Sequence, residues 1–225
     1  MPPKIIIGLA DIHGDLSQIS RVFADAGKVD LVVLMGDITN FGRREAAQKV
    51  IDTLRNYCQN IYAVTGNCDY PEVEDYLQEC RLSLHRCCRI FQGIPFYGIY
   101  GSLPCPGRTP GEYPESHFTT GLAESAAGST QGSSPILVTH QPPVNTKNDL
   151  AHSGEHVGSS AVRAFIETAQ PPICFCGHIH EGRGIDYIGT TPILNPGPLR
   201  QGSYAYADIR DDNIAVSIRT PCRSM

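Results

Sequence analysis

Two features are absent from this 225-residue sequence, and each excludes a class of partner. It has no block of lysine and arginine, and its formal net charge is -5, so the general attraction to phosphates that an extended nucleic acid requires is missing. It also lacks a long apolar run near its start, where three isoleucines precede Gly8. A run this short forms neither a signal-peptide core nor a membrane span, so we predict a cytoplasmic protein without a membrane partner.

A third absence concerns the cysteines, which form no C-x-x-C pair. Their odd number and their spacing match neither a disulfide framework nor a four-thiolate zinc site. We expect most of them to be small, buried apolar residues in a reducing compartment. The nine are Cys58, Cys68, Cys80, Cys87, Cys88, Cys105, Cys174, Cys176 and Cys222.

The sequence does contain a regular alternation of strands and helices. Continuous β-branched runs at 4–10, 30–36 and 61–65 predict strands buried on both faces, with a helix between each pair. This βαβαβ order predicts a parallel sheet, and the length and the 41% hydrophobic content suffice for one domain over 1–225. Further strands are expected at 89–101 (two, around a turn), 135–140, 173–178, 191–195, 204–209 and 213–218, and helices at 43–57, about 71–80 and 159–169.

Two aspartates are expected to begin helices. Asp15, with Gln18 three residues later, has the spacing of a capping box for the first helix. Asp69, followed by Pro71, is expected to cap the third.

Residues 102–134 differ from the rest of the chain, because Gly, Pro, Ser and Thr dominate and large apolar residues are few. We predict an insertion without regular structure, which is either a lid or substrate-selecting wall beside a site, or plain mobile surface.

Seven polar residues follow the ends of five predicted strands. In an open α/β sheet the carboxyl ends of the strands form the ligand crevice, so these residues should meet there. The Asp-x-His and His-x-His pairs place two side chains on one face of an extended segment, as a metal site requires. The seven are Asp11, His13, Asp37, Asn67, His140, His178 and His180.

These residues stand in motifs that resemble those of the calcineurin-like metallophosphoesterase superfamily, namely D-x-H, G-D, G-N-H-D/E, H and G-H-x-H. The match runs from Lys4 to about Ile209, and the GNCD sequence at 66–69 looks most like the compact bacterial and archaeal phosphodiesterase-type members. The resemblance implies an α/β fold, a four-layer αββα sandwich of two mixed sheets flanked by helices. The matching segments are Asp11-Ile12-His13, Gly36-Asp37, Gly66-Asn67, Thr139-His140 and Gly177-His178-Ile179-His180.

The resemblance also implies a site for two divalent metal ions that share Asp37. Ligands that mix nitrogen and oxygen without thiolate suit Mn, Fe, Zn, Ni or Co, and we expect Mn. A metal-bridging hydroxide would attack phosphorus in a phosphodiester, with Asp37, Asn67 and His140 supporting the chemistry most directly. The implied ligands are Asp11, His13, Asp37 and His180 for one metal, and Asp37, Asn67, His140 and His178 for the other.

This chain departs from the family pattern where many members carry a leaving-group acid. The residue after Asn67 is a histidine in those members and Cys68 here, which we expect to pack rather than to donate a proton. The loss of an acid slows poor leaving groups most, so activity on aryl diesters should exceed activity on alkyl monoesters. His152 and His156 are candidate replacements, whereas His117 is expected to be solvated.

Other departures argue against two enzyme classes. Phe41 stands where Ser/Thr phosphatases carry a phosphate-gripping arginine, with Arg43 and Arg44 slightly further on. Asn40 stands where purple acid phosphatases carry a tyrosine.

Three functions are weighed on the same residues. A phosphodiesterase acting on a small phosphoester or nucleotide-like substrate is favoured because all seven ligands are present. The alternatives are a phosphomonoesterase or nucleotidase, and a protein-binding scaffold that has kept the fold and lost catalysis.

Overall fold

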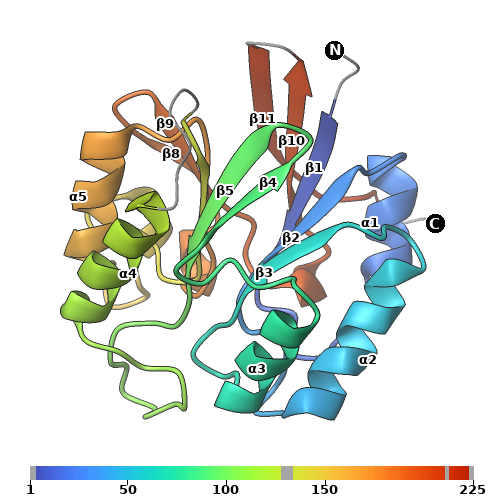
Figure 1. The fold of residues 1–225 in the computed structure, drawn as a ribbon, viewed down its shortest axis with the longest axis horizontal. Coiled ribbons are helices and arrows are strands. Elements are labelled where there is room, and N and C mark those ends of the chain that lie inside the picture. The colour runs from blue at the N-terminus through green and yellow to red at the C-terminus, as the bar shows by residue number, and fades with distance from the viewer. Residues whose placement is uncertain (1–3, 128–133, 211–212, 223–225) are drawn as a thin grey trace.

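Two mixed β-sheets pack against each other and carry helices on their outer faces (Figure 1). This confirms the αββα sandwich that the family resemblance implies. The computed structural model describes residues 4–127, 134–210 and 213–222. Within these residues, the helices are too short or too polar to cross a membrane.

The apolar runs near the start of the chain form the centre of the first sheet. β1 (Lys4–Leu9), β2 (Leu31–Met35) and β3 (Ile61–Val64) are parallel neighbours, as the βαβαβ order predicts. β10 (Tyr204–Arg210) and β11 (Asn213–Arg219) continue it on the other side of β1 as antiparallel strands. The strand order is β11-β10-β1-β2-β3.

The second sheet has the order β4-β5-β6-β7-β9-β8. Its four inner strands are parallel, and the strands at the two edges run antiparallel to their neighbours. The strands are β4 (Cys88–Phe91), β5 (Ile94–Ile99), β6 (Ile136–Thr139), β7 (Cys174–Phe175), β8 (Gly184–Ile188) and β9 (Thr191–Asn195).

Helices cover the outer face of each sheet (Figure 1). α1 (Ile19–Ala26), α2 (Arg44–Arg55) and α3 (Pro71–Glu79) pack on the first sheet, and α4 (Glu115–Ala127) and α5 (Ser160–Ala169) on the second. Three short 3₁₀ turns, η1 (Lys147–Asp149), η2 (His180–Gly182) and η3 (Leu199–Gln201), lie in connecting loops.

The core between the sheets fixes how their strand ends meet. Ile6 and Val33 of the first sheet share one buried cluster with Phe96, Val138 and Phe175 of the second. Burial of these side chains provides most of the favourable free energy of packing, because it removes apolar surface from water. The rigid sandwich therefore sets the positions of the loops that follow β1, β2, β3, β6 and β7.

Both predicted helix caps are wrong. α1 begins at Ile19, and the Asp15 carboxylate accepts a hydrogen bond from the backbone N–H of Ser17, two residues on, at 2.9 Å. The Asp15 side chain therefore stabilises a local turn before α1 and does not cap the helix. Tyr70, not Asp69, is the N-cap residue of α3.

The 102–134 insertion also differs from the prediction, because α4 occupies much of it. Residues 102–114 form the irregular start of the segment, 128–133 lie outside the described residues, and the role of the segment as a lid stays a prediction. Two strand predictions need correction: β7 has two residues, and β8 was not predicted. Of the nine cysteines, all free, four are buried, so the expectation that most are buried is too broad.

Stacked aromatic rings anchor the described part of the insertion. His117 of α4 stacks on Tyr113 with ring centroids 4.2 Å apart, and His85 stacks on Tyr100 at 3.5 Å. His117 is therefore a half-buried residue that packs against other rings, and the expectation that it is solvated is wrong. Burial, with the nearby charges of His117 and Arg86, lowers the pKa of His85 to about 3.

His85 should make the stability of the fold depend on pH. The unfolded chain binds a proton at His85 below about pH 6.5 and the folded chain does not, so stability is lost as pH falls from 6.5 toward 3. We expect His85→Gln to reduce the loss of unfolding free energy between pH 7 and pH 5 by about 1–2 kcal/mol. Urea denaturation of both proteins at several pH values measures this. If the unfolding free energies of the two proteins changed with pH in parallel, His85 would not be the source of the pH dependence.

Candidate metal centre

The loops after β1 and β2 run side by side, and their backbones are strained. The N–H groups of Asp11 and His13 donate to the carbonyls of Gly36 and Asp37 at 3.2 and 2.8 Å. Asp11, His13 and Asp37 have φ values of 51°, 48° and 48°, in the left-handed region that costs energy for residues with a Cβ. His178 has a φ of 68°. Four of the seven predicted ligands thus hold conformations that local preference disfavours, which is typical of functional sites.

Two glycines make this crowding sterically feasible. A Cβ at Gly36 would lie 2.4 Å from Nδ1 of His140, and one at Gly66 would lie 2.1 Å from Oδ1 of Asp37. Any side chain at either position would displace a predicted ligand.

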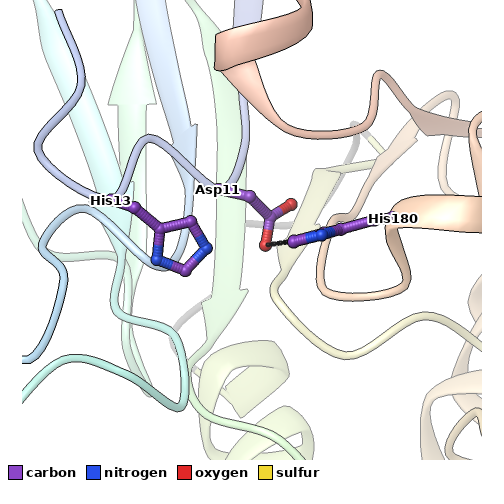
Figure 2. A group of neighbouring side chains, drawn as sticks. All are labelled: Asp11, His13 and His180. Carbon is purple, nitrogen blue, oxygen red and sulfur yellow. Dashed lines mark ion pairs between the residues drawn. The ribbon is translucent and has the colours of Figure 1, made fainter.

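Asp11, His13 and His180 form one half of the cluster (Figure 2). One donor atom from each lies within 4.8 Å of the others, and Nε2 of His180 is 3.4 Å from Oδ1 of Asp11. This contact raises the pKa of His180. Burial acts to raise the pKa of Asp11, but the His180 contact and the nearby histidines outweigh it and leave that pKa below its ordinary value. Nδ1 of His13 is buried without a hydrogen-bond partner among the described atoms.

Asp37 connects the two halves. Its Oδ2 lies 3.6 Å from Nε2 of His13, and its Oδ1 lies 3.5 Å from Nε2 of His140. The carboxylate is 3% exposed, and each of its oxygens faces a different half. This is the arrangement expected of a bridging ligand.

His140 and Asn67 turn acceptor atoms toward each other. Nδ1 of His140 lies 2.7 Å from the carbonyl oxygen of Met35, which can only accept, so Nδ1 carries a hydrogen; in this tautomer Nε2 carries a lone pair. The Asn67 amide nitrogen donates to Oγ1 of Thr109 at 3.0 Å, which leaves Oδ1 facing Nε2 of His140 at 2.9 Å. With a neutral ring no hydrogen joins these two atoms, whereas a cation would satisfy both.

His178 is brought close to the cluster but is placed less tightly. Its ring centroid is 4.9 Å from that of His140, and its backbone N–H donates to the Asp11 carboxylate at 3.2 Å. Within the described residues, none of the three close groups of donor atoms includes a His178 nitrogen. Burial, with the nearby His140, lowers the pKa of His178 to about 3, so the ring is neutral as a metal ligand must be.

Cys68 lies closer to the ligands than a packing residue needs to. Its sulfur is within 4.8 Å of donor atoms of His13 and Asp37, and its backbone N–H donates to Oδ1 of Asp37 at 2.8 Å. Burial, with the Asp37 carboxylate, raises the pKa of the thiol well above its ordinary value. Without a cation nearby the thiol is therefore protonated at neutral pH and is a poor nucleophile.

Asp69 holds the site's loops together instead of capping a helix. Its buried carboxylate accepts backbone hydrogen bonds from Ile38, Thr39 and Gly66 at 3.1, 2.8 and 2.9 Å, and one from the Thr39 hydroxyl at 2.8 Å. These bonds join the loop of Asp37 to the loop of Asn67. Unsatisfied backbone groups at this buried position outweigh the benefit of a cap on an exposed helix end.

The two candidate acids, His152 and His156, have different surroundings. His152 is exposed, its Nε2 lies 3.2 Å from Oε1 of Glu181, and it lines a hollow together with His180. Nδ1 of His156 instead lies 2.8 Å from the buried Asp149, and His156 is not among the residues lining that hollow.

Sequence reasoning missed Arg200. It lines the hollow that contains His180 and a second one that contains Asp11 and His13. No motif marks it, because it belongs to the 3₁₀ turn η3, which only the fold brings beside β1.

The donor groups described above could hold metal ions. The family model for calcineurin-like phosphoesterases matches residues 5–182, and the chain belongs to this family. The uncharacterized protein MJ1162 of Methanocaldococcus jannaschii is 38% identical over 197 residues, 86% of this chain and 88% of that protein.

Two further similarities are more limited. Phosphodiesterase YfcE of Escherichia coli K12 is 40% identical over 77 residues, which cover 30% of this chain and 41% of YfcE. The crystal structure of TT1561 of Thermus thermophilus superposes with a TM-score of 0.72, covering 95% of this chain and 98% of that one. At 18% identity, this second similarity shows the fold alone.

Removing the Asp69 carboxylate should destabilise the site's loops. Asp69→Ala leaves three backbone N–H groups without their acceptor, so we expect the free energy of unfolding to fall by about 2–4 kcal/mol. Asp75→Ala, an exposed aspartate on the adjacent α3, should change it by less than about 0.5 kcal/mol. Chemical denaturation measures both variants, and equal effects would contradict the role given to Asp69.

Proposed function

We propose that the chain hydrolyses phosphodiesters with the help of two divalent metal ions. Membership of the calcineurin-like phosphoesterase family supports a phosphoester hydrolase. The observation that carries the metal requirement is the 2.9 Å approach of Nε2 of His140 to Oδ1 of Asn67; in the tautomer whose Nδ1–H faces Met35, both atoms are acceptors beside the Asp37 carboxylate. A cation between these atoms would remove their mutual repulsion.

The residues present fit a pair of metal ions. Asp11, His13 and His180 would hold one, Asn67, His140 and His178 the other, and Asp37 both, because its two oxygens face different halves. Nitrogen and oxygen donors suit Mn, Fe, Zn, Ni or Co, with Mn proposed as the metal used. When bound, such ions act as Lewis acids that make water a stronger nucleophile and offset negative charge on the phosphoryl oxygens.

The chain's own residues prepare the site for this chemistry. The Met35 carbonyl fixes the tautomer of His140, and Thr109 fixes the orientation of the Asn67 amide. Asp69 holds the loops that carry Asp37 and Asn67, so the donors are in place before substrate binds.

A preference for diesters and good leaving groups rests on two features. Cys68 replaces the histidine that serves as the acid in many family members, and its protonated thiol is buried. The phosphodiesterase name of the partial relative YfcE agrees with this preference. Between the candidate acids, we favour His152 because it lines the hollow beside His180.

A metal screen tests the proposal. Metal-free protein should not hydrolyse bis(4-nitrophenyl) phosphate, and added Mn²⁺ should restore turnover. Asp37→Asn should lower kcat by about 100-fold or more, since it weakens the ligand proposed to be shared by the two metal ions. Full activity without metal would contradict the metal requirement. If no metal supported hydrolysis of phosphomonoesters, phosphodiesters or cyclic nucleotides, the alternative of a protein-binding scaffold would be favoured.

Leaving-group dependence tests His152. We expect His152→Ala to slow an alkyl phosphodiester about 10²-fold more than a 4-nitrophenyl diester, because only the poor leaving group needs a proton. His156→Ala should affect both substrates equally. Equal effects of His152→Ala on the two substrates would remove it as the acid.

A further inference from the structure

Arg200 is fixed beside the predicted ligands by its backbone. The N–H of Leu199 donates to the carbonyl of Ala10, the residue before Asp11, at 3.1 Å, and Ala10 and Pro198 form an isolated parallel bridge. The Leu199 side chain is fully buried in the core between the first sheet and its helices. The turn that carries Arg200 is therefore anchored through both the backbone and the side chain of Leu199, while the Arg200 side chain is exposed.

Two hollows are lined by Arg200. One, of about 350 Å³, is also lined by Asp11 and His13, and the other, of about 430 Å³, by His152 and His180. No lysine or other arginine lines either hollow. Among the described residues, no carboxylate lies within the 4.0 Å that defines an ion pair with Arg200.

The arginines nearer to Asp37 in the sequence are already engaged. Arg43 pairs with Glu72 and lies over the Tyr70 ring, 4.2 Å from its centroid. Arg44 pairs with Glu79 on α3. Neither lines the two hollows, and Phe41 carries no charge. Of the arginines considered for gripping a phosphate, Arg200 alone faces the metal ligands without an ion-pair partner among the described residues.

We propose that Arg200 binds the non-bridging oxygens of the phosphoryl group at this site. The inference rests on the proposed function, and it names the residue that positions the substrate phosphate. A planar guanidinium presents two parallel N–H donors to two phosphate oxygens, which a lysine cannot do. Arg200 thereby supplies from η3 the contact that other phosphatases obtain from an arginine after the bridging aspartate.

Binding of inorganic phosphate to Mn²⁺-loaded protein tests the proposal without requiring turnover. Isothermal titration calorimetry should show that Arg200→Ala raises the Kd for phosphate by about 10- to 100-fold, as expected for loss of a charge-assisted contact. Arg200→Lys should fall between the wild type and Arg200→Ala. With bis(4-nitrophenyl) phosphate, kcat/KM should fall by a similar factor, while the bound Mn²⁺ per chain stays unchanged.

Arg183→Ala is the matched control, because Arg183 is also exposed, follows η2 and lines neither hollow. It should leave the Kd for phosphate within about twofold of the wild type. An equal rise in both variants, or no rise in Arg200→Ala, would overturn the proposal. A rise confined to Arg200→Ala in a protein that hydrolyses no ester would support the phosphate site and contradict the hydrolase function.

Discussion

The hydrogen bonds to Asp69 are the constraint on which the site depends. One buried carboxylate joins the loop after β2 to the loop after β3, and so fixes Asp37 relative to Asn67. Burial and the nearby Asp37 carboxylate raise the pKa of Asp69 to about 6, so the protein keeps two acidic groups close together in its interior at an electrostatic cost. Such a cost at the ends of rigid strands is typical of a site that is completed by cations.

The other polar groups of the site are also arranged to favour a bound cation. The chain places carboxylates, an amide oxygen and imidazole nitrogens together, and turns the hydrogens of His140 and Asn67 away toward Met35 and Thr109. Bound cations would reverse the sign of the local charge, so a chain with a net charge of -5 could still attract a phosphoester. Arg200 adds a positive group to two hollows that are also lined by predicted ligands.

Much of this arrangement could be predicted from sequence because the ligands follow strand ends, and buried strands are marked by continuous apolar runs. The role of Asp69 could not be predicted. The local sequence Asp69-x-Pro71 indicates a helix cap, and only the tertiary fold brings the backbone of Ile38 and Thr39 within reach of the carboxylate. α4 was not predicted because glycine is unfavourable in a helix, yet tertiary packing requires one here. A Cβ at Gly121 would lie 2.3 Å from the Ile99 side chain. Arg200 could not be predicted either, because it lies on the short 3₁₀ turn η3 and in no motif.

The central claim is that Asp37 is shared by two metal ions, and metal stoichiometry tests it most directly. Equilibrium dialysis against Mn²⁺ followed by elemental analysis should give two ions per wild-type chain. Asp37→Ala should lose affinity at both sites, while His180→Ala should weaken one site and leave the other occupied. A wild-type chain that binds no Mn²⁺, or an Asp37→Ala variant that still binds two ions with unchanged affinity, would contradict the account.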